Sequence, residues 1–429
     1  MLREEVAADA EREDEDDESE AAGHGARIGS PMPRLKIVRR LLLLVAVLVF
    51  VDTMLYAALT PLLPHLVHDK SRAGILVAAY AAGALIGGLP GGVAAVRLGA
   101  RRAVLLGLTG MGLASLGFAF AGGFWSLFAA RLLQGLGSGF TWAGAFAWLL
   151  AAAPADRRGE LIGSAMGAAV FGALFGPVIG AAAALAGRDV VFAALASLAV
   201  LLGVWTLRIA EVPEEEHPSL AAVARALRNR HFAAGLALMA LASLLFGVLS
   251  TLGPLHLSHA GWGSAAIGGL WLGGAALETI ESPLLGRISD RHGRLLPVRV
   301  GLSASALVAA GLALGLRPLV YAPLVVLAGM AFGSLFTPAF VLISDGAERA
   351  RLAQGMAFGV MNAAWALGAV VGPAAAGAIA GATGDWIPYV LTAGACAVAL
   401  GFARSRSQHE GAAVVVDRLT GDAAGVRRQ

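Results

Sequence analysis

The sequence predicts an all-α integral membrane protein, with twelve transmembrane helices in two pseudo-symmetric six-helix bundles. Three observations predict this class. The first is composition: 58% of the residues are hydrophobic, only 14% are charged and the mean hydropathy is +0.74, whereas soluble domains carry about 25% charged residues. The second is the presence of apolar stretches long enough to cross a bilayer. The third is a long glycine–proline motif that occurs once in each half of the chain.

The apolar stretches form two groups of six, because a transmembrane helix needs about 20 apolar residues. The first group covers residues 41–66, 73–95, 103–122, 124–152, 160–186 and 189–209. The second group covers residues 233–257, 264–288, 295–316, 319–344, 353–380 and 385–404. The expected bundles are therefore residues 34–210 and residues 232–404.

Polar segments flank and separate these bundles. Residues 1–33 include an acidic run from Glu11 to Glu20 that cannot build a core, so they are expected to be a disordered cytoplasmic tail. Residues 405–429 are expected to form a second such tail. Residues 211–231 are expected to be a cytoplasmic linker, whose later part has the pattern of a short basic amphipathic helix on the membrane surface.

Basic residues cluster in alternate loops, which indicates the orientation of the chain. The clusters are Arg34, Lys36, Arg39 and Arg40; Arg97, Arg101 and Arg102; Arg157 and Arg158; Arg287, Arg291 and Arg294; and Arg349 and Arg351. Because basic loops remain in the cytoplasm, both termini are expected there, in a protein of the cell (inner) membrane. The excess of arginine over lysine and the abundance of alanine and glycine are typical of a GC-rich bacterial genome.

The repeated motif lies in the fifth and eleventh predicted spans. It reads Gly163-x8-Gly172-x3-Gly176-Pro177-x2-Gly180 in the first half and Gly359-x8-Gly368-x3-Gly372-Pro373-x3-Gly377 in the second. Such glycines let a neighbouring helix approach closely, and the proline bends the helix. We expect these residues to form a structural seal between the halves and not to contact a ligand.

Four signatures resemble the major facilitator superfamily and together touch most of the membrane body. One is the loop from Gly286 to Arg294, similar to the family pattern G-x-x-x-D-R-x-G-R through Gly286, Asp290, Arg291, Gly293 and Arg294. Its counterpart contains Gly92, Arg97, Gly99, Arg101 and Arg102, with Val96 where the family has Asp. The resemblance implies tight turns and charge contacts that hold the halves together on the cytoplasmic side, and the missing Asp implies a weaker contact in the first half. The other interpretation is that these arginines serve topology alone.

The three remaining signatures lie in spans 4, 5 and 1. Arg131 and Gln134 resemble the R-x-x-Q-G motif, which implies a polar cavity; the other interpretation is that Arg131 reaches the outer membrane interface. The span 5 motif resembles that of the drug:proton antiporter branch, with Ala181 in place of a second glycine. In span 1, Asp52 followed by Pro61 and Pro64 is similar to the first-span motif of the same branch.

Buried carboxylates are the candidate proton-coupling groups. Asp52 is about 16 Å along the helix from Leu41, near the midplane, where a carboxylate is suited to proton exchange. Glu278 and Glu281 in span 8 are three residues apart, so both would rarely be ionised together. The other interpretations are a permanently paired Asp52, and a Glu281 that belongs to the charge contacts with Arg287 or Arg291. Candidate cavity residues are Tyr56, Gln134, Trp142, Trp271, Asn362 and Trp365.

The sequence predicts a secondary active transporter and not an enzyme. Cys396 is the only cysteine, no histidine spacing indicates a metal site, and the chain has no Walker-type loop, so no cofactor is expected. No nucleic-acid patch is present. The favoured function is proton-coupled export of a small lipophilic or cationic compound by a monomer, with Asp52 pairing to Arg131 when deprotonated. The alternatives are a major facilitator importer of a metabolite, an intramembrane enzyme and a membrane sensor.

Overall fold

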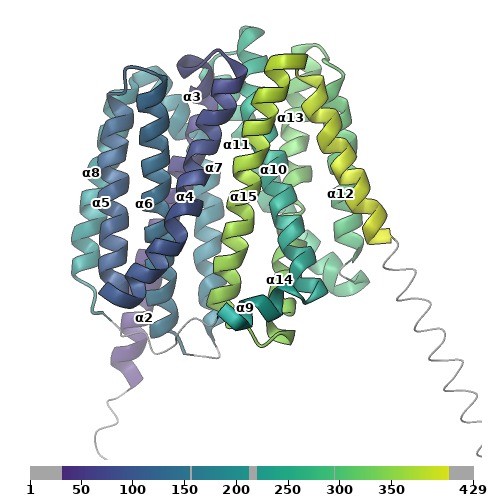
Figure 1. Ribbon diagram of the computed structural model, residues 1–429. Helices are drawn as coiled ribbons and strands as arrows, with labels where there is room; N and C mark the ends of the chain where they lie inside the picture. Colours follow the sequence, from purple (N-terminus) through teal and green to yellow (C-terminus); the bar gives the residue numbers. More distant parts are fainter. Residues whose placement is uncertain (1–30, 155–156, 212–219, 294, 405–429) are drawn as a thin grey trace, which may run out of the picture.

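The structure is a computed structural model that describes residues 31–154, 157–211, 220–293 and 295–404. Every regular element in these ranges is a helix, which agrees with the predicted all-α class (Figure 1). The predicted tails lie outside the described residues, except that the first helix already begins at Pro31. Most of the predicted linker, residues 212–219, also lies outside them.

The helices of the first half follow the predicted spans closely. They are α2 (Pro31–Ala57), α3 (Leu59–Leu66), α4 (Lys70–Leu98), α5 (Ala100–Ala119), α6 (Phe124–Ala152), α7 (Arg158–Ala186) and α8 (Arg188–Leu207). The linker contributes α9 (Leu220–Leu227), where the amphipathic helix was predicted. The helices of the second half are α10 (Arg230–His259), α11 (Ser264–His292), α12 (Leu295–Ala313), α13 (Pro318–Gly333), α14 (Phe336–Arg349), α15 (Gln354–Thr383) and a last helix, Trp386–Arg404.

Ten spans of the described chain are long and apolar enough to cross a membrane. The two further predicted spans are α6 and α11, which have the required length of 29 residues each. α6 carries Arg131 and Gln134, and α11 carries Glu278 and Glu281.

Two spans are interrupted. The first consists of α2 and α3, because Pro61 lacks the N–H group that would donate to the carbonyl oxygen of Ala57. The tenth consists of α13 and α14, with Pro338 just after the interruption. Membrane helices tolerate such interruptions only where other groups satisfy the freed backbone atoms.

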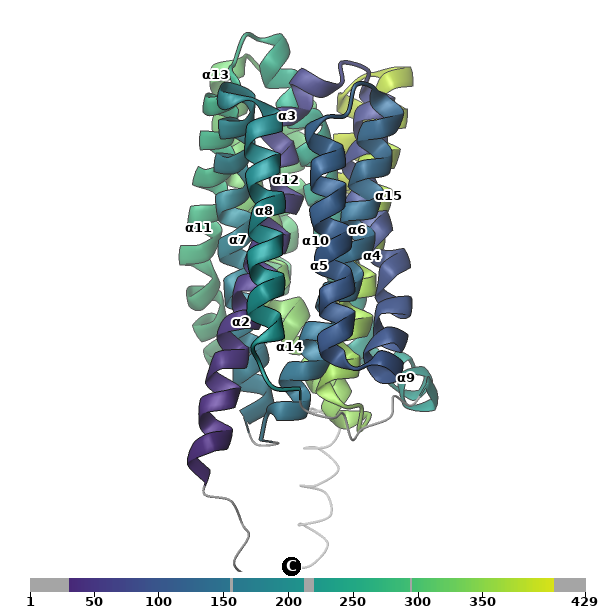
Figure 2. The ribbon, with the colours of Figure 1, turned by 90° about the vertical axis from the view of Figure 1, so that its left-hand side faces the viewer.

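Each half has its own hydrophobic core. One core is built from residues 38–209 together with Leu255, and the other from residues 226–396. The halves meet where α4 packs along α15 and α7 along α11, so the second and fifth spans of one half contact the eleventh and eighth of the other. α5 and α8 form the outer face of the first half (Figure 2). We call the two ends of the bundle the α3 end and the α9 end.

Candidate substrate and proton site

The interruption of the first span exposes backbone carbonyl groups in the middle of the first half. Arg131 of α6 donates from Nη1 to the carbonyl oxygen of Leu55 at 3.0 Å and from Nη2 to that of Tyr56 at 3.1 Å. Its side chain is only 1% exposed, which contradicts the interpretation that it reaches the membrane interface. Arg131 therefore stabilises the broken helix by binding carbonyl groups at its end.

Asp52 lies one helical turn before these carbonyl groups and is also buried. Its Oδ1 accepts a hydrogen bond from the Tyr80 hydroxyl at 2.8 Å, and its Oδ2 accepts one from Trp142 Nε1 at 2.7 Å. Among the described residues no ion pair joins Asp52 to Arg131. Instead the Arg131 guanidinium lies over the Tyr80 ring, 4.6 Å from its centroid, so Tyr80 stands between the acid and the base.

A buried hydrogen-bond chain continues from Arg131 toward α5. Arg131 donates from Nη1 to Gln134 Oε1 at 3.0 Å, and Gln134 donates from Nε2 to the Ser115 hydroxyl at 3.1 Å. Gln134 is fully buried, so it supports Arg131 and does not line a cavity as predicted. Its role as a wall residue was wrong because the sequence does not show which face of α6 meets α5.

Aromatic rings connect this site to the second half. The Tyr56 ring lies 5.5 Å from the Tyr80 ring and 5.2 Å from the Trp365 ring of α15, with the latter pair edge to face. Trp142 stacks on Phe146. Tyr56, Trp142 and Trp365 are all partly exposed, so they are placed to contact a bound molecule at the boundary between the halves.

The second-half candidates are more dispersed. The Glu278 carboxyl group lies directly against Gly333 of α13, where an added Cβ would overlap it. Glu281 is partly buried, and Trp271 packs against Gly253. Asn362 lies on α15 three residues before Trp365 and is partly exposed. Both glutamates lie on α11 of the second half, whereas Asp52 lies on α2 of the first half.

At the α3 end an ion pair that sequence reasoning did not identify joins the halves. Lys70 Nζ, at the start of α4, lies 2.7 Å from Asp385 Oδ1 in the loop before the last helix. His256 Nδ1 lies 3.9 Å from Asp385 Oδ2. Burial tends to raise the pKa of Asp385, but the nearby His256 ring and the hydrogen bond from Lys70 outweigh it and hold the pKa below its usual value. The sequence feature that could have indicated this ion pair is Lys70, because lysine is rare in this chain and the loops at this end carry few charges.

Two further polar contacts between the halves lie at the same end. The Ser71 hydroxyl donates to the carbonyl oxygen of Gly377 at 3.4 Å, and the Ser264 hydroxyl lies 3.2 Å from His65 Nδ1. Together with the Lys70 pair, these contacts cross the boundary between the halves. Polar groups therefore join the halves at the α3 end in this conformation.

The expected seal by the repeated motif requires correction. The glycines of each copy pack against the first helix of their own half: Gly172, Gly176 and Gly180 meet the backbone of α2 and its continuation, and Gly368 and Gly372 meet α10. Three residues of the motif contact the other half. The carbonyl oxygen of Pro177 lies against Gly268, and the carbonyl oxygen of Pro373 and the backbone of Gly377 lie against Gly74. The sequence showed close packing sites but not which helix fills them.

The two loop motifs differ in what the structure describes. Gly99 and Gly293 have φ values of 95° and 84°, the left-handed region that favours glycine, so the expected tight turns are present. In the first-half loop Val96 and Arg97 are exposed, and Arg101 Nη2 lies 3.6 Å from Glu211 Oε2 of the linker. Gly92 has open space beside it. Arg291 is exposed, whereas Arg294 and the side chains at 286 and 290 lie outside the described set.

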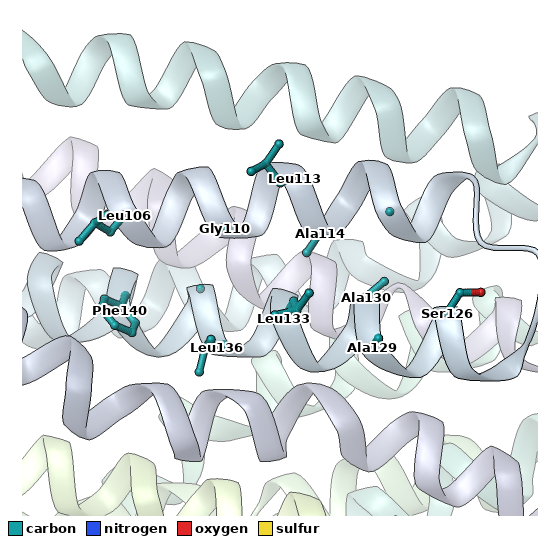
Figure 3. A pocket seen from close by; sticks show the side chains of 12 residues that line it. Leu106, Gly110, Leu113, Ala114, Ser126, Ala129, Ala130, Leu133, Leu136 and Phe140 are labelled. Atoms are coloured by element: carbon teal, nitrogen blue, oxygen red, sulfur yellow. The ribbon is translucent and has the colours of Figure 1, made fainter.

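A separate groove lies between α5 and α6. Its volume is about 730 Å³, and it is lined by small and apolar residues that include Gly110, Leu113, Leu133 and Phe140 (Figure 3). Leu113 and Leu133 are exposed on the outer surface of the first half. The groove therefore faces away from Asp52 and is not part of the candidate site.

Comparisons with known proteins agree on one family. The family model described as Major Facilitator Superfamily matches residues 41–356. An uncharacterized MFS-type transporter of Escherichia coli, YcaD, is 27% identical over 233 residues, which cover 53% of this chain and 60% of that protein. The chain thus matches about 60% of the length of this curated relative.

Two solved structures share the fold. A bacterial homologue of the human lysosomal transporter Spinster, in an inward-facing and unoccupied conformation, superposes with a TM-score of 0.70 at 15% identity, covering 87% of this chain and 97% of that one. The nucleoside transporter NupG superposes with a TM-score of 0.65 at 16% identity, covering 85% of this chain and 98% of that one.

Proposed function

Because the chain belongs to the Major Facilitator Superfamily and is a multi-pass membrane transporter, not an enzyme, we propose that it exports a small lipophilic or cationic compound in exchange for protons. The observation that carries this proposal is Asp52. A carboxyl group buried in a membrane helix is costly and is retained where it has a task. Its partners Tyr80 and Trp142 are neutral, so Asp52 has no fixed positive partner that would keep it ionised permanently.

The exchange needs only one shared acid. A cationic substrate near Asp52 would favour the ionised carboxylate, and proton binding would remove that attraction, so that each ligand weakens binding of the other. Tyr56, Trp142 and Trp365 offer aromatic faces beside Asp52, which suit an apolar or cationic molecule. Glu278 in the second half is proposed as a further acid for cationic substrates, with Glu281 one turn away.

Alternating access would open the two ends in turn. From the distribution of basic loops we propose that the α9 end is cytoplasmic, that the membrane is the cell (inner) membrane and that both termini are cytoplasmic. The ion pair of Lys70 with Asp385 would then close the outer end while the site faces the cytoplasm. We propose the same two bundles as above, residues 34–210 and 232–404, as the units that move.

The test uses purified protein in liposomes with an imposed pH gradient and a panel of lipophilic cations. Lumenal pH is followed when each compound is added, for the wild type, for Asp52→Asn and for Glu348→Gln. Glu348 is an exposed carboxylate and serves as the matched control. We expect substrate-evoked proton efflux in the wild type and in Glu348→Gln, and its loss in Asp52→Asn. Full proton-coupled transport by Asp52→Asn would refute the proposed mechanism.

The second candidate is import of a small metabolite by symport or facilitated diffusion. The structural similarity to NupG, which is described as a nucleoside transporter, favours keeping this candidate. Cells that express the protein separate the two functions, because an exporter depletes its substrate and an importer accumulates it. Absence of proton movement with every cation, together with metabolite accumulation, would establish the importer.

A further inference from the structure

Tyr80 is held in one position by three neighbours. Its side chain is 1% exposed. An added Cβ at Gly135 of α6 would overlap the Tyr80 carbonyl oxygen, so the backbones of α4 and α6 are in direct contact at this point. The Arg131 guanidinium covers the Tyr80 ring, and the Tyr56 ring lies 5.5 Å from it. The hydroxyl group therefore has little freedom to leave Asp52.

The Tyr80 hydroxyl has two acceptors on the same residue. It lies 2.8 Å from Asp52 Oδ1 and 3.3 Å from the backbone carbonyl oxygen of Asp52. Trp142 Nε1 also donates to this carboxyl group and can only donate, whereas a phenol can both donate and accept. Ser138, fully buried on α6, is the other hydroxyl beside Asp52.

These contacts permit two complete hydrogen-bond arrangements. When Asp52 is ionised, Tyr80 donates to Oδ1. When a proton from solution converts Asp52 to the carboxylic acid, the new O–H can donate to the Tyr80 oxygen, while Tyr80 turns its own proton to the backbone carbonyl oxygen. Tyr80 keeps its proton throughout, and the proton on Asp52 later returns to solution.

We propose that Tyr80 is a positioning residue that supplies Asp52 with a hydrogen-bond partner in both protonation states. This inference rests on the proposed function, in which Asp52 exchanges protons. The titratable and charged groups that face Asp52 are Tyr80 of α4, Arg131 of α6 and Tyr56 of its own helix. α7 also packs on α2, but its only titratable residues, Arg158 and Glu160, lie in its first turn, and α15 has none.

The test compares Tyr80→Phe, which removes the hydroxyl and keeps the ring, with Tyr389→Phe. Tyr389 is a buried tyrosine of the second half whose hydroxyl lies 2.8 Å from that of Tyr321, so the control removes one buried hydroxyl contact elsewhere. Infrared difference spectra of the substrate-free protein report the carboxylic acid C=O band of Asp52, which is assigned by its absence in Asp52→Asn. Titrating this band needs no transport.

We expect Tyr80→Phe to move the midpoint of the Asp52 band to higher pH by about one to two units, because a hydrogen bond to the ionised form is lost. The pH profile of antiport should move in the same direction, with a substrate KM within about threefold of the wild type. Tyr389→Phe should leave the midpoint unchanged. A purely structural role for Tyr80 would instead lower the transport rate equally at every pH.

An unchanged or lowered midpoint in folded Tyr80→Phe would overturn the inference. If Tyr80→Phe does not fold, 3-fluorotyrosine at position 80 tests the inference instead. Its hydroxyl is a stronger hydrogen-bond donor, so the midpoint of the Asp52 band should move to lower pH. An unchanged midpoint would overturn the inference. The two proposals fail separately. Antiport retained by Asp52→Asn refutes the proposed function, whereas antiport lost in Asp52→Asn with no midpoint change in Tyr80→Phe refutes only the role of Tyr80.

Discussion

Removing the ion pair between Lys70 and Asp385 should shift the protein toward conformations that are open at the α3 end. The two groups lie 2.7 Å apart, and their side chains are 28% and 27% exposed. A pair of this kind, partly exposed and hydrogen-bonded, contributes about 1 kcal/mol at the upper end of the range for surface pairs. Since about 1.4 kcal/mol corresponds to a factor of ten, Lys70→Met should raise the population open at this end about fivefold.

The assay is the labelling rate of one cysteine that the closed α3 end covers. Ser264 is 5% exposed and contacts His65 across the boundary, so Ser264→Cys, made in a Cys396→Ser background, reports opening. The parent and every variant compared with it carry both Ser264→Cys and Cys396→Ser. We expect Lys70→Met to be labelled about fivefold faster than the parent by a membrane-impermeant maleimide.

Two controls test the electrostatic reasoning. Arg72→Met removes a positive charge at the same end, but Arg72 contacts Phe124 of its own half, so labelling should not change. The charge exchange Lys70→Asp with Asp385→Lys should return the rate to within about twofold of the parent, because it restores an ion pair between the same two positions. An unchanged rate in Lys70→Met, or an equal increase in Arg72→Met, would refute the role of the pair.

Three further predictions concern the same conformational balance and the packing beneath it. His256 and Lys70 hold the pKa of Asp385 below its usual value in the closed state. The stabilisation of the closed state by ionised Asp385 is therefore fully present above the usual aspartate pKa and is lost as the pH falls through the lowered value. Spin-label distances between α4 and α15 should lengthen only below about pH 4, and lengthening between pH 7 and 5 would have to come from another group. Val96→Asp should strengthen the first-half contact at the α9 end and raise cysteine accessibility at the α3 end, and an unchanged labelling pattern would count against the idea. Gly135→Ala should destabilise the protein by about 1–3 kcal/mol because its Cβ would overlap the Tyr80 backbone; Gly88→Ala, where a Cβ meets open space, should change the melting temperature little, and equal shifts for both would contradict the packing argument.

Several features of this protein could be predicted from local sequence because they depend on local physical chemistry. Hydrophobic length alone predicts where helices cross a bilayer, since an unpaired backbone group in lipid is too costly. The positive φ values at Gly99 and Gly293 follow from the turn that each loop requires. The burial of Asp52 and Arg131 with hydrogen-bond partners was also predictable, because an ionisable group deep in an apolar stretch needs a partner.

What the sequence could not specify is which partner each group has. Asp52 and Arg131 were expected to pair, but the packing of α4 against α6 inserts Tyr80 between them, and Arg131 binds carbonyl groups that the break at Pro61 makes available. Gln134 faces Ser115 and not a cavity. Lys70 and Asp385 are 315 residues apart in the chain. The sequence by itself determined the elements and the buried charges, because hydrophobicity and ionisation are properties of single residues. Only the tertiary structure decided the contacts, because they depend on which faces of separate helices meet.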